Sequence, residues 1–135
     1  MSYQFDPERM YRMPIQFGPS LGPRQGRNAA KYANDVSPKK TVVSVSYLSE
    51  SEKIESLLPP GFSVCGEPVV TISASYVTEI EWLAGRGYNM LAVTFPARFD
   101  GERDRVEGRF LAVLWENLAD PIITGREELG FSKVY

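Results

Sequence analysis

Residues 120–133 hold the side chains of this sequence that are best suited to chemistry. The segment is short, acidic and interrupted by glycine, and it carries a basic pair, Arg126 and Lys133. The chain has no histidine and a single cysteine, Cys65, which excludes Ser-His-Asp and Cys-His nucleophiles, histidine acid–base catalysis and ordinary zinc sites. Catalysis by this chain must therefore use Lys, Arg, Asp, Glu, Tyr, Ser or a bound cofactor.

The order of residues around Lys133 resembles a known motif. Residues 125–127 read Gly-Arg-Glu and residues 130–133 read Gly-Phe-Ser-Lys, which is similar to the stretch that carries the Schiff-base lysine in the acetoacetate decarboxylase family. Residues 57–62 (LLPPGF) and the Glu-Pro pair at 67–68 resemble upstream segments of the same family. The resemblance covers residues 39–135.

The resemblance implies a cofactor-free lyase that acts on a small keto acid. The amine of Lys133 would attack the ketone and form an iminium, and decarboxylation, aldol or dehydration chemistry would follow. An amine is nucleophilic only when neutral, so it needs desolvation or a neighbouring cation, and acetoacetate decarboxylase is the standard example. Arg126 would supply that cation or bind the substrate carboxylate, and Glu127 would orient Arg126 or transfer protons. We take Lys133, Glu127 and Arg126 as the catalytic candidates.

Three positions depart from the family pattern. The second lysine of the family is Val134 here, and the proline before the reactive lysine is Ser132. The glutamate that the family carries near residues 84–90 has no counterpart, unless Glu79 or Glu81 turns towards the site. The missing carboxylate weakens the case for acetoacetate decarboxylation itself but leaves Schiff-base chemistry in place.

Three further residues are candidates for binding the substrate. Arg86 and Tyr88 lie in the region where the family has its glutamate, and Lys40 lies close to the place of a family arginine that contacts substrate. The assignment of Lys40 depends on spacing alone. Each of these residues, like Arg126 and Glu127, is also compatible with an ordinary surface or turn role.

Strand patterns dominate the sequence after residue 40. Residues 1–40 are rich in Pro, Gly, Arg, Asn and Gln and predict an extended N-terminal arm. A capping-box pattern over 49–52 predicts a short helix that stops before Pro59, and another helix or turn is expected within 117–130, interrupted by Gly125 and Gly130. Alternating β-branched and apolar residues predict strands over 41–48, 62–65, 68–83, 88–99, 106–115 and 131–135.

These elements predict an α+β domain over residues 41–135 that is mainly antiparallel β. Successive long strands joined by hairpins usually close into a barrel, which removes open edges, and the family resemblance implies the same acetoacetate decarboxylase-like β-barrel. The pattern stops in mid-strand at Tyr135. We therefore expect an incomplete barrel that forms a homo-oligomer or pairs with a complementary C-terminal segment.

Composition narrows the possible partners. The net charge is -2 and the pI is about 5.2, so nothing indicates binding to nucleic acid. The apolar runs are too short to span a membrane, and the N-terminus lacks a secretory signal, which predicts a cytoplasmic protein. No metal or organic cofactor is expected. Two alternatives to an enzyme remain: a truncated chain that needs a missing half, and a β-barrel ligand-binding module that has lost the chemistry.

Overall fold

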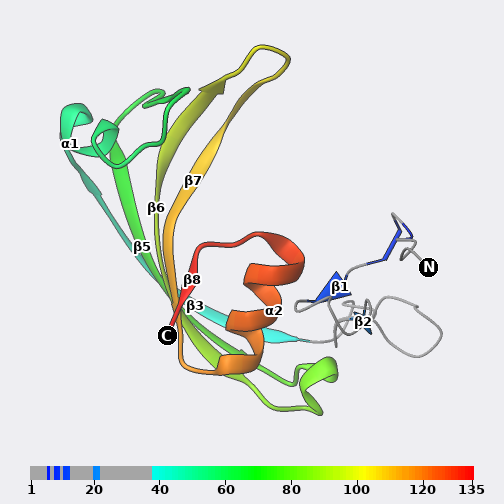
Figure 1. Cartoon of the computed structure of the whole chain (residues 1–135). Coiled ribbons are helices and arrows are strands. Elements are labelled where there is room, and N and C mark those ends of the chain that lie inside the picture. Colours follow the sequence, from blue (N-terminus) through cyan, green and yellow to red (C-terminus); the bar gives the residue numbers. More distant parts are fainter. Residues whose placement is uncertain (1–5, 7, 10, 13–19, 22–37) are drawn as a thin grey trace.

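The computed structural model describes residues 6, 8, 9, 11, 12, 20, 21 and 38–135 (Figure 1). Most of the predicted N-terminal arm lies outside these residues. Within the arm, β1 (Tyr11–Arg12) pairs antiparallel with β2 (Ser20–Leu21). The remaining elements belong to the predicted domain.

One six-stranded sheet forms the body of the domain. Its strands follow the order β3-β5-β6-β7-β8, and β4 pairs with β6 outside this path. Two α-helices and one 3-10 helix connect the strands. The elements in chain order are β3 (Lys39–Leu48), α1 (Ser51–Glu55), β4 (Phe62–Ser63), β5 (Val69–Thr78), η2 (Glu81–Leu83), β6 (Tyr88–Asp100), β7 (Arg105–Glu116), α2 (Ala119–Leu129) and β8 (Lys133–Val134).

The long strands confirm the alternating pattern of the sequence. β3, β5, β6 and β7 pair antiparallel with their neighbours in the sheet, so the mainly antiparallel α+β architecture is confirmed. A register shift between Val93 and Thr94 marks a bulge in the pairing of β6 with β7. Strand β3 begins at Lys39, before the predicted start at residue 41, because Lys39 and Lys40 already pair with Thr78 and Val77 of β5.

Three local predictions were wrong. The N-cap of α1 is Glu50, without a side-chain capping bond, so the predicted capping box does not form. The long strand predicted over 68–83 ends at Thr78, because Glu79 adopts a positive φ of 57° that breaks the extended chain. Helix α2 runs through Gly125 and ends only at Gly130, whose φ is 71°.

The last strand is parallel to its neighbour, which the hairpin pattern did not predict. Strand β8 pairs with β7 in parallel, with Leu114 opposite Lys133 and Trp115 opposite Val134. Helix α2 lies between these two strands in the chain, and Figure 1 shows it beside the sheet. A helical crossover returns the chain to the sheet in the direction in which it left. Across the described strands the sheet stays open between β3 and β8, so the predicted barrel is not closed here.

Apolar residues pack in two separate clusters. Ile54 of α1 packs with Val70 and Phe95, while Val77 packs with Ile80 and Leu83. A row of cross-strand neighbours between these clusters is exposed: Val43, Leu91, Trp115 and Val134 are 60%, 41%, 41% and 39% exposed. No helix in the described part of the chain is long and apolar enough to cross a membrane.

Candidate functional site

Lys133 lies in the interior of the domain, although it is close to the end of the described chain. The residue is 4% exposed. Its Nζ atom is 2.8 Å from Oε1 of Glu116 and donates a hydrogen bond of 3.0 Å to the carbonyl oxygen of Pro121. A buried lysine is rare unless it is paired, so this side chain differs from a solvated surface cation.

The sheet register brings Glu116 to Lys133. Side chains alternate between the two faces of a strand, so Leu114 and Glu116 of β7 point to the same face. Lys133 is opposite Leu114 in the parallel pair and points to that face as well. The carboxylate and the amine, which are separated by the whole of α2 in the sequence, therefore meet across adjacent strands.

Among the described residues, the ion-pair partner of Glu116 is Lys133. Its side chain is fully buried, and neither carboxylate oxygen accepts a hydrogen bond of good geometry from the residues that the structure describes. The contact with Nζ is therefore a charge–charge contact and not an aligned hydrogen bond. A buried carboxylate in such surroundings is costly unless the opposite charge stays beside it.

Helix α2 provides the wall against which Lys133 lies. The helix buries Pro121, Ile122, Thr124 and Gly125, and the hydroxyl of Thr124 bonds back to the carbonyl of Asp120 at 2.9 Å. A Cβ atom on Gly125 would overlap the Cδ, Cε and Nζ atoms of Lys133. In the position that Lys133 adopts here, its side chain passes the helix through the space that Gly125 leaves by having no Cβ atom.

Two aromatic rings complete the surroundings of the amine. The ring centroids of Tyr88 and Phe131 lie 6.0 Å and 5.8 Å from Lys133 Nζ. These distances are at the outer limit for a cation–π contact. At this position the rings favour a cation, either the ammonium of Lys133 or an iminium formed on it.

A comparison of the chain with models of protein families tests the family resemblance that the motif around Lys133 indicated. The model described as "Acetoacetate decarboxylase (ADC)" matches residues 12–135. The chain belongs to the acetoacetate decarboxylase family. A comparison with curated protein sequences gave no match.

Solved structures agree with this family fold. The enduracididine biosynthesis enzyme MppR complexed with pyruvate is similar at 16% identity with a TM-score of 0.58, over 72% of this chain and 38% of that chain. The acetoacetate decarboxylase of Legionella pneumophila subsp. pneumophila str. Philadelphia 1 is similar at 25% identity with a TM-score of 0.54, over 70% of this chain and 35% of that chain. The chain thus spans little more than a third of the length of these relatives.

The structure places the other predicted catalytic residues on α2, outside the buried pair. Arg126 is exposed, and it lines a pocket of about 420 Å³ together with Lys133, Phe131 and Ser132. Glu127 is exposed one residue further along the helix and is not among the residues that line this pocket. Arg126 therefore shares a cavity with the family lysine, whereas Glu127 does not contact that cavity.

The predicted substrate-binding residues lie at different distances from the amine. Tyr88 is the ring described above. Arg86 is exposed, and its guanidinium is 3.6 Å from the carboxylate of Asp120 at the start of α2. Lys40 pairs with Val77, and Val77 pairs with Tyr88, so Lys40 points to the same face as Tyr88, two strands away.

Sequence reasoning missed Glu116. The expected carboxylate was sought near residues 84–90, and Glu79 instead accepts a hydrogen bond of 2.8 Å from Lys39. The carboxylate beside the family lysine comes from the end of β7. A signal was available, because Glu116 continues the inward alternation of Leu114 one residue beyond the predicted strand end at 115. Among the described residues no group of three or more metal-ligating side chains is arranged to hold an ion.

Proposed function

We propose that this chain carries the reactive lysine of a cofactor-free, Schiff-base-forming lyase that acts on a small keto acid. Lys133 is the nucleophile. The observation that supports this most strongly is the burial of its amine at 4% exposure, against a helix whose Gly125 leaves space for it. A structural surface lysine needs neither feature.

Glu116 is the group that exchanges protons with the nucleophile. Desolvation opposes the charge on an amine, and a neighbouring carboxylate favours it. Glu116 is the carboxylate beside the Lys133 amine. Transfer of one proton from Nζ to the adjacent carboxylate turns two buried charges into a neutral amine and a neutral acid. The lone pair of the amine then attacks the ketone carbon of the substrate, and the C=O electron pair moves to oxygen. One proton passes from the nitrogen to this oxygen, which gives the neutral carbinolamine.

The same acid completes formation of the iminium. The protonated Glu116 donates its proton to the carbinolamine hydroxyl, which leaves as water while nitrogen forms the C=N double bond. For a β-keto acid, the electrons of the bond to the carboxylate move into the iminium and carbon dioxide leaves, giving an enamine. Protonation of the enamine carbon and hydrolysis release the ketone and restore Lys133. Aldol or dehydration chemistry uses the same iminium and enamine.

The residues around the amine divide the remaining tasks. Arg126 lines the pocket next to Lys133, and its planar fork of donors suits the carboxylate of a keto acid. The Tyr88 and Phe131 rings lie close enough to stabilise the cationic iminium. Arg86, which contacts Asp120, and Lys40, which lies on the same face, assist at a greater distance.

The family supports a keto acid as the substrate class. MppR, a similar structure, has been observed with pyruvate bound. The present chain spans 38% of that protein, so activity is proposed for the protein in which this domain works. In that protein the open sheet is completed to the barrel of the family by a complementary segment or by another copy.

Reductive trapping tests the proposal. Incubation with pyruvate or acetoacetate and borohydride should add one substrate-derived mass to the wild-type chain, and Lys133→Met should abolish it. Lys53→Met is the matched control, because Lys53 is an exposed lysine paired with Glu50. Equal trapping in wild type and Lys133→Met would disprove the role of Lys133.

A further inference from the structure

Arg109 is held in one orientation by neutral groups from two neighbouring strands. Its Nε atom donates to Oγ1 of Thr94 at 3.0 Å, and Nη2 donates to Oγ1 of Thr71 at 2.8 Å and to the carbonyl of Thr94 at 3.0 Å. Thr71 in turn shares a hydrogen bond of 2.9 Å with Ser46 of β3. The guanidinium is thus tied across four strands before any ligand arrives.

Arg109 lacks the anionic partner that its neighbours have. Arg98 and Arg105, which lie on the same hairpin, form ion pairs with Asp100 at 2.8 Å and 3.3 Å. Arg109 has no carboxylate within 4.0 Å among the residues placed by the structure, and its three hydrogen bonds engage only Nε and Nη2. A guanidinium has five donors, so the two donors of Nη1 remain available to an anion.

The position of Arg109 relates it to the lysine site. Thr94, Ala92 and Met90 alternate with residues of the opposite face along β6 and share one face. Arg109 bonds Thr94 at one end of this row, and Met90 pairs with Glu116 at the other. Arg109 and Lys133 therefore lie on the same face of the sheet. Lys133 is opposite Leu114, which pairs with Ala92, and Arg109 pairs with Pro96. Their backbone positions are thus four residues apart in register, about 13 Å along the strand direction at roughly 3.3 Å per residue.

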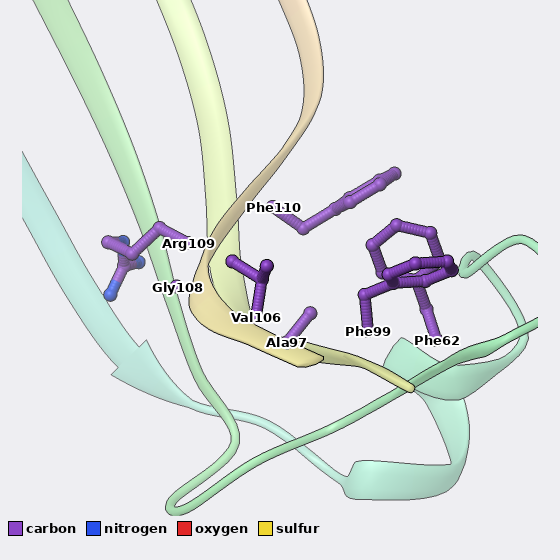
Figure 2. Close-up of a pocket in the computed structure, with 7 residues that line it drawn as sticks. All are labelled: Phe62, Ala97, Phe99, Val106, Gly108, Arg109 and Phe110. Atoms are coloured by element: carbon purple, nitrogen blue, oxygen red, sulfur yellow. The ribbon is translucent and has the colours of Figure 1, made fainter. Parts of the chain in front are cut away.

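The guanidinium does not belong to the nearby aromatic pocket. Phe62, Phe99 and Phe110 line a pocket of about 270 Å³ to which Arg109 also contributes. Figure 2 shows the Arg109 side chain extending across the strands, away from the three rings. Because Arg109 and Phe110 are consecutive residues of β7, their side chains point to opposite faces of the sheet.

We propose that Arg109 is an anion subsite that binds the distal carboxylate of a keto acid whose ketone reaches Lys133. The inference depends on the proposed function of Lys133 and specifies its substrate: a dicarboxylic keto acid longer than pyruvate or acetoacetate. Such a substrate lies along β6, over the small Ala92 side chain. The carboxylate accepts the Nη1 donors, and the threonines hold the fork in place, so little ordering is needed on binding.

The first experiment compares two keto acids that differ only at the distal end. The concentration giving half-maximal borohydride trapping should be about tenfold lower for 2-oxooctanedioate than for 2-oxooctanoate, as expected for one charge-assisted pair. Arg109→Gln should abolish this preference, Arg109→Lys should retain part of it, and Arg105→Gln should leave it unchanged. An unchanged preference in Arg109→Gln, or none in the wild type, would overturn the subsite.

The second experiment separates the subsite from the imine chemistry. Octanedioate has no ketone and cannot form an imine, so its binding is independent of Lys133 reactivity. It should shift the Nε–H resonance of Arg109 in a saturable manner, whereas neutral octanediol should not. If no keto acid is trapped but this shift is seen, the proposed function fails and the subsite stands. No shift would refute the subsite itself.

Discussion

Lys133 and Glu116 form a buried ion pair between two parallel strands, with 2.8 Å between Nζ and Oε1. The lysine comes from the family motif, whereas the glutamate comes from the preceding strand. They meet because Lys133 is opposite Leu114, and Glu116 follows Leu114 on the same face. This buried pair is the centre of the proposed chemistry.

Removing one member of the pair should destabilise the domain strongly. Lys133→Met leaves the Glu116 carboxylate buried without its cation, and we expect the free energy of unfolding to fall by about 3–5 kcal/mol. The double variant Lys133→Met/Glu116→Leu should recover most of this loss, since both charges are gone. Urea denaturation, monitored by circular dichroism, measures the free energy of unfolding of the single and the double variant. Additive losses in the double variant would show that the two side chains do not act as a pair.

Replacing the carboxylate by an amide should slow the chemistry more than it weakens the fold. Glu116→Gln preserves shape but cannot accept the proton of Lys133, so we expect imine formation to slow by about 100-fold or more, the usual contribution of a general acid–base group. Borohydride trapping reactions with pyruvate, quenched at successive times, give this rate. Glu127→Gln, on the exposed surface of α2, is the matched control. A rate for Glu116→Gln equal to that of wild type would remove Glu116 from the mechanism.

Gly125→Ala should destabilise the protein, although alanine is the better helix former. In an ordinary helix interior this change stabilises by about 1 kcal/mol. Here the new Cβ would overlap the Lys133 chain, and displacing that chain breaks its contacts with Glu116 and Pro121. We expect a net loss of about 1–3 kcal/mol together with reduced trapping.

Gly108→Ala, in strand β7, is the control for the added methyl group, because a Cβ there has no atom within 4 Å. Thermal unfolding of both variants supplies the comparison. A Gly125→Ala variant more stable than wild type would show that position 125 does not confine the lysine.

Arg86→Ala should have little effect on stability. Its contact with Asp120 is 3.6 Å long, and both side chains are more than half exposed. Exposed pairs of this kind contribute about 0–1 kcal/mol, so the free energy of unfolding measured by chemical denaturation should barely change. If Arg86 binds substrate, the keto-acid concentration for half-maximal trapping rises while stability stays the same. An unaltered concentration would assign Arg86 to the surface.

Arg126→Gln should weaken substrate binding and leave the fold intact. Arg126 is exposed and lines the pocket of Lys133. Loss of a charge-assisted hydrogen bond to a substrate carboxylate costs about 1.5–3 kcal/mol, which is roughly a tenfold to hundredfold rise in the half-saturating concentration of pyruvate. The trapping assay measures it, and unchanged binding would contradict the proposed role.

The sequence predicted the long strands because their burial alternates. The alternation along β6 and β7 marks a more buried face in each strand, whereas β3 was predicted from its β-branched run and is exposed along its whole length. Local sequence signals for helix ends failed where contacts with distant residues determine the structure. Ser49 and Glu52 match a capping box, but α1 begins at Ser51. Gly125 suggested a break, whereas its place in α2 is set by the lysine chain that crosses it.

The site was only half predictable for a similar reason. Lys133 stands in a motif of fixed local spacing, which a single sequence displays. Glu116 becomes its neighbour only through the parallel register of β7 and β8, and that register depends on how α2 returns the chain to the sheet. The sequence did not indicate a role for Arg109. Its guanidinium is positioned by hydrogen bonds to Thr71 and Thr94, which belong to two other strands.

The most direct test of the central claim is peptide mapping of the chain after incubation with pyruvate and borohydride. The buried amine beside Glu116 predicts a single reduced adduct, located on Lys133, with the exposed Lys39, Lys40 and Lys53 unmodified. Adducts distributed over the exposed lysines, or a folded protein that carries none, would contradict the assignment of Lys133 as the Schiff-base residue.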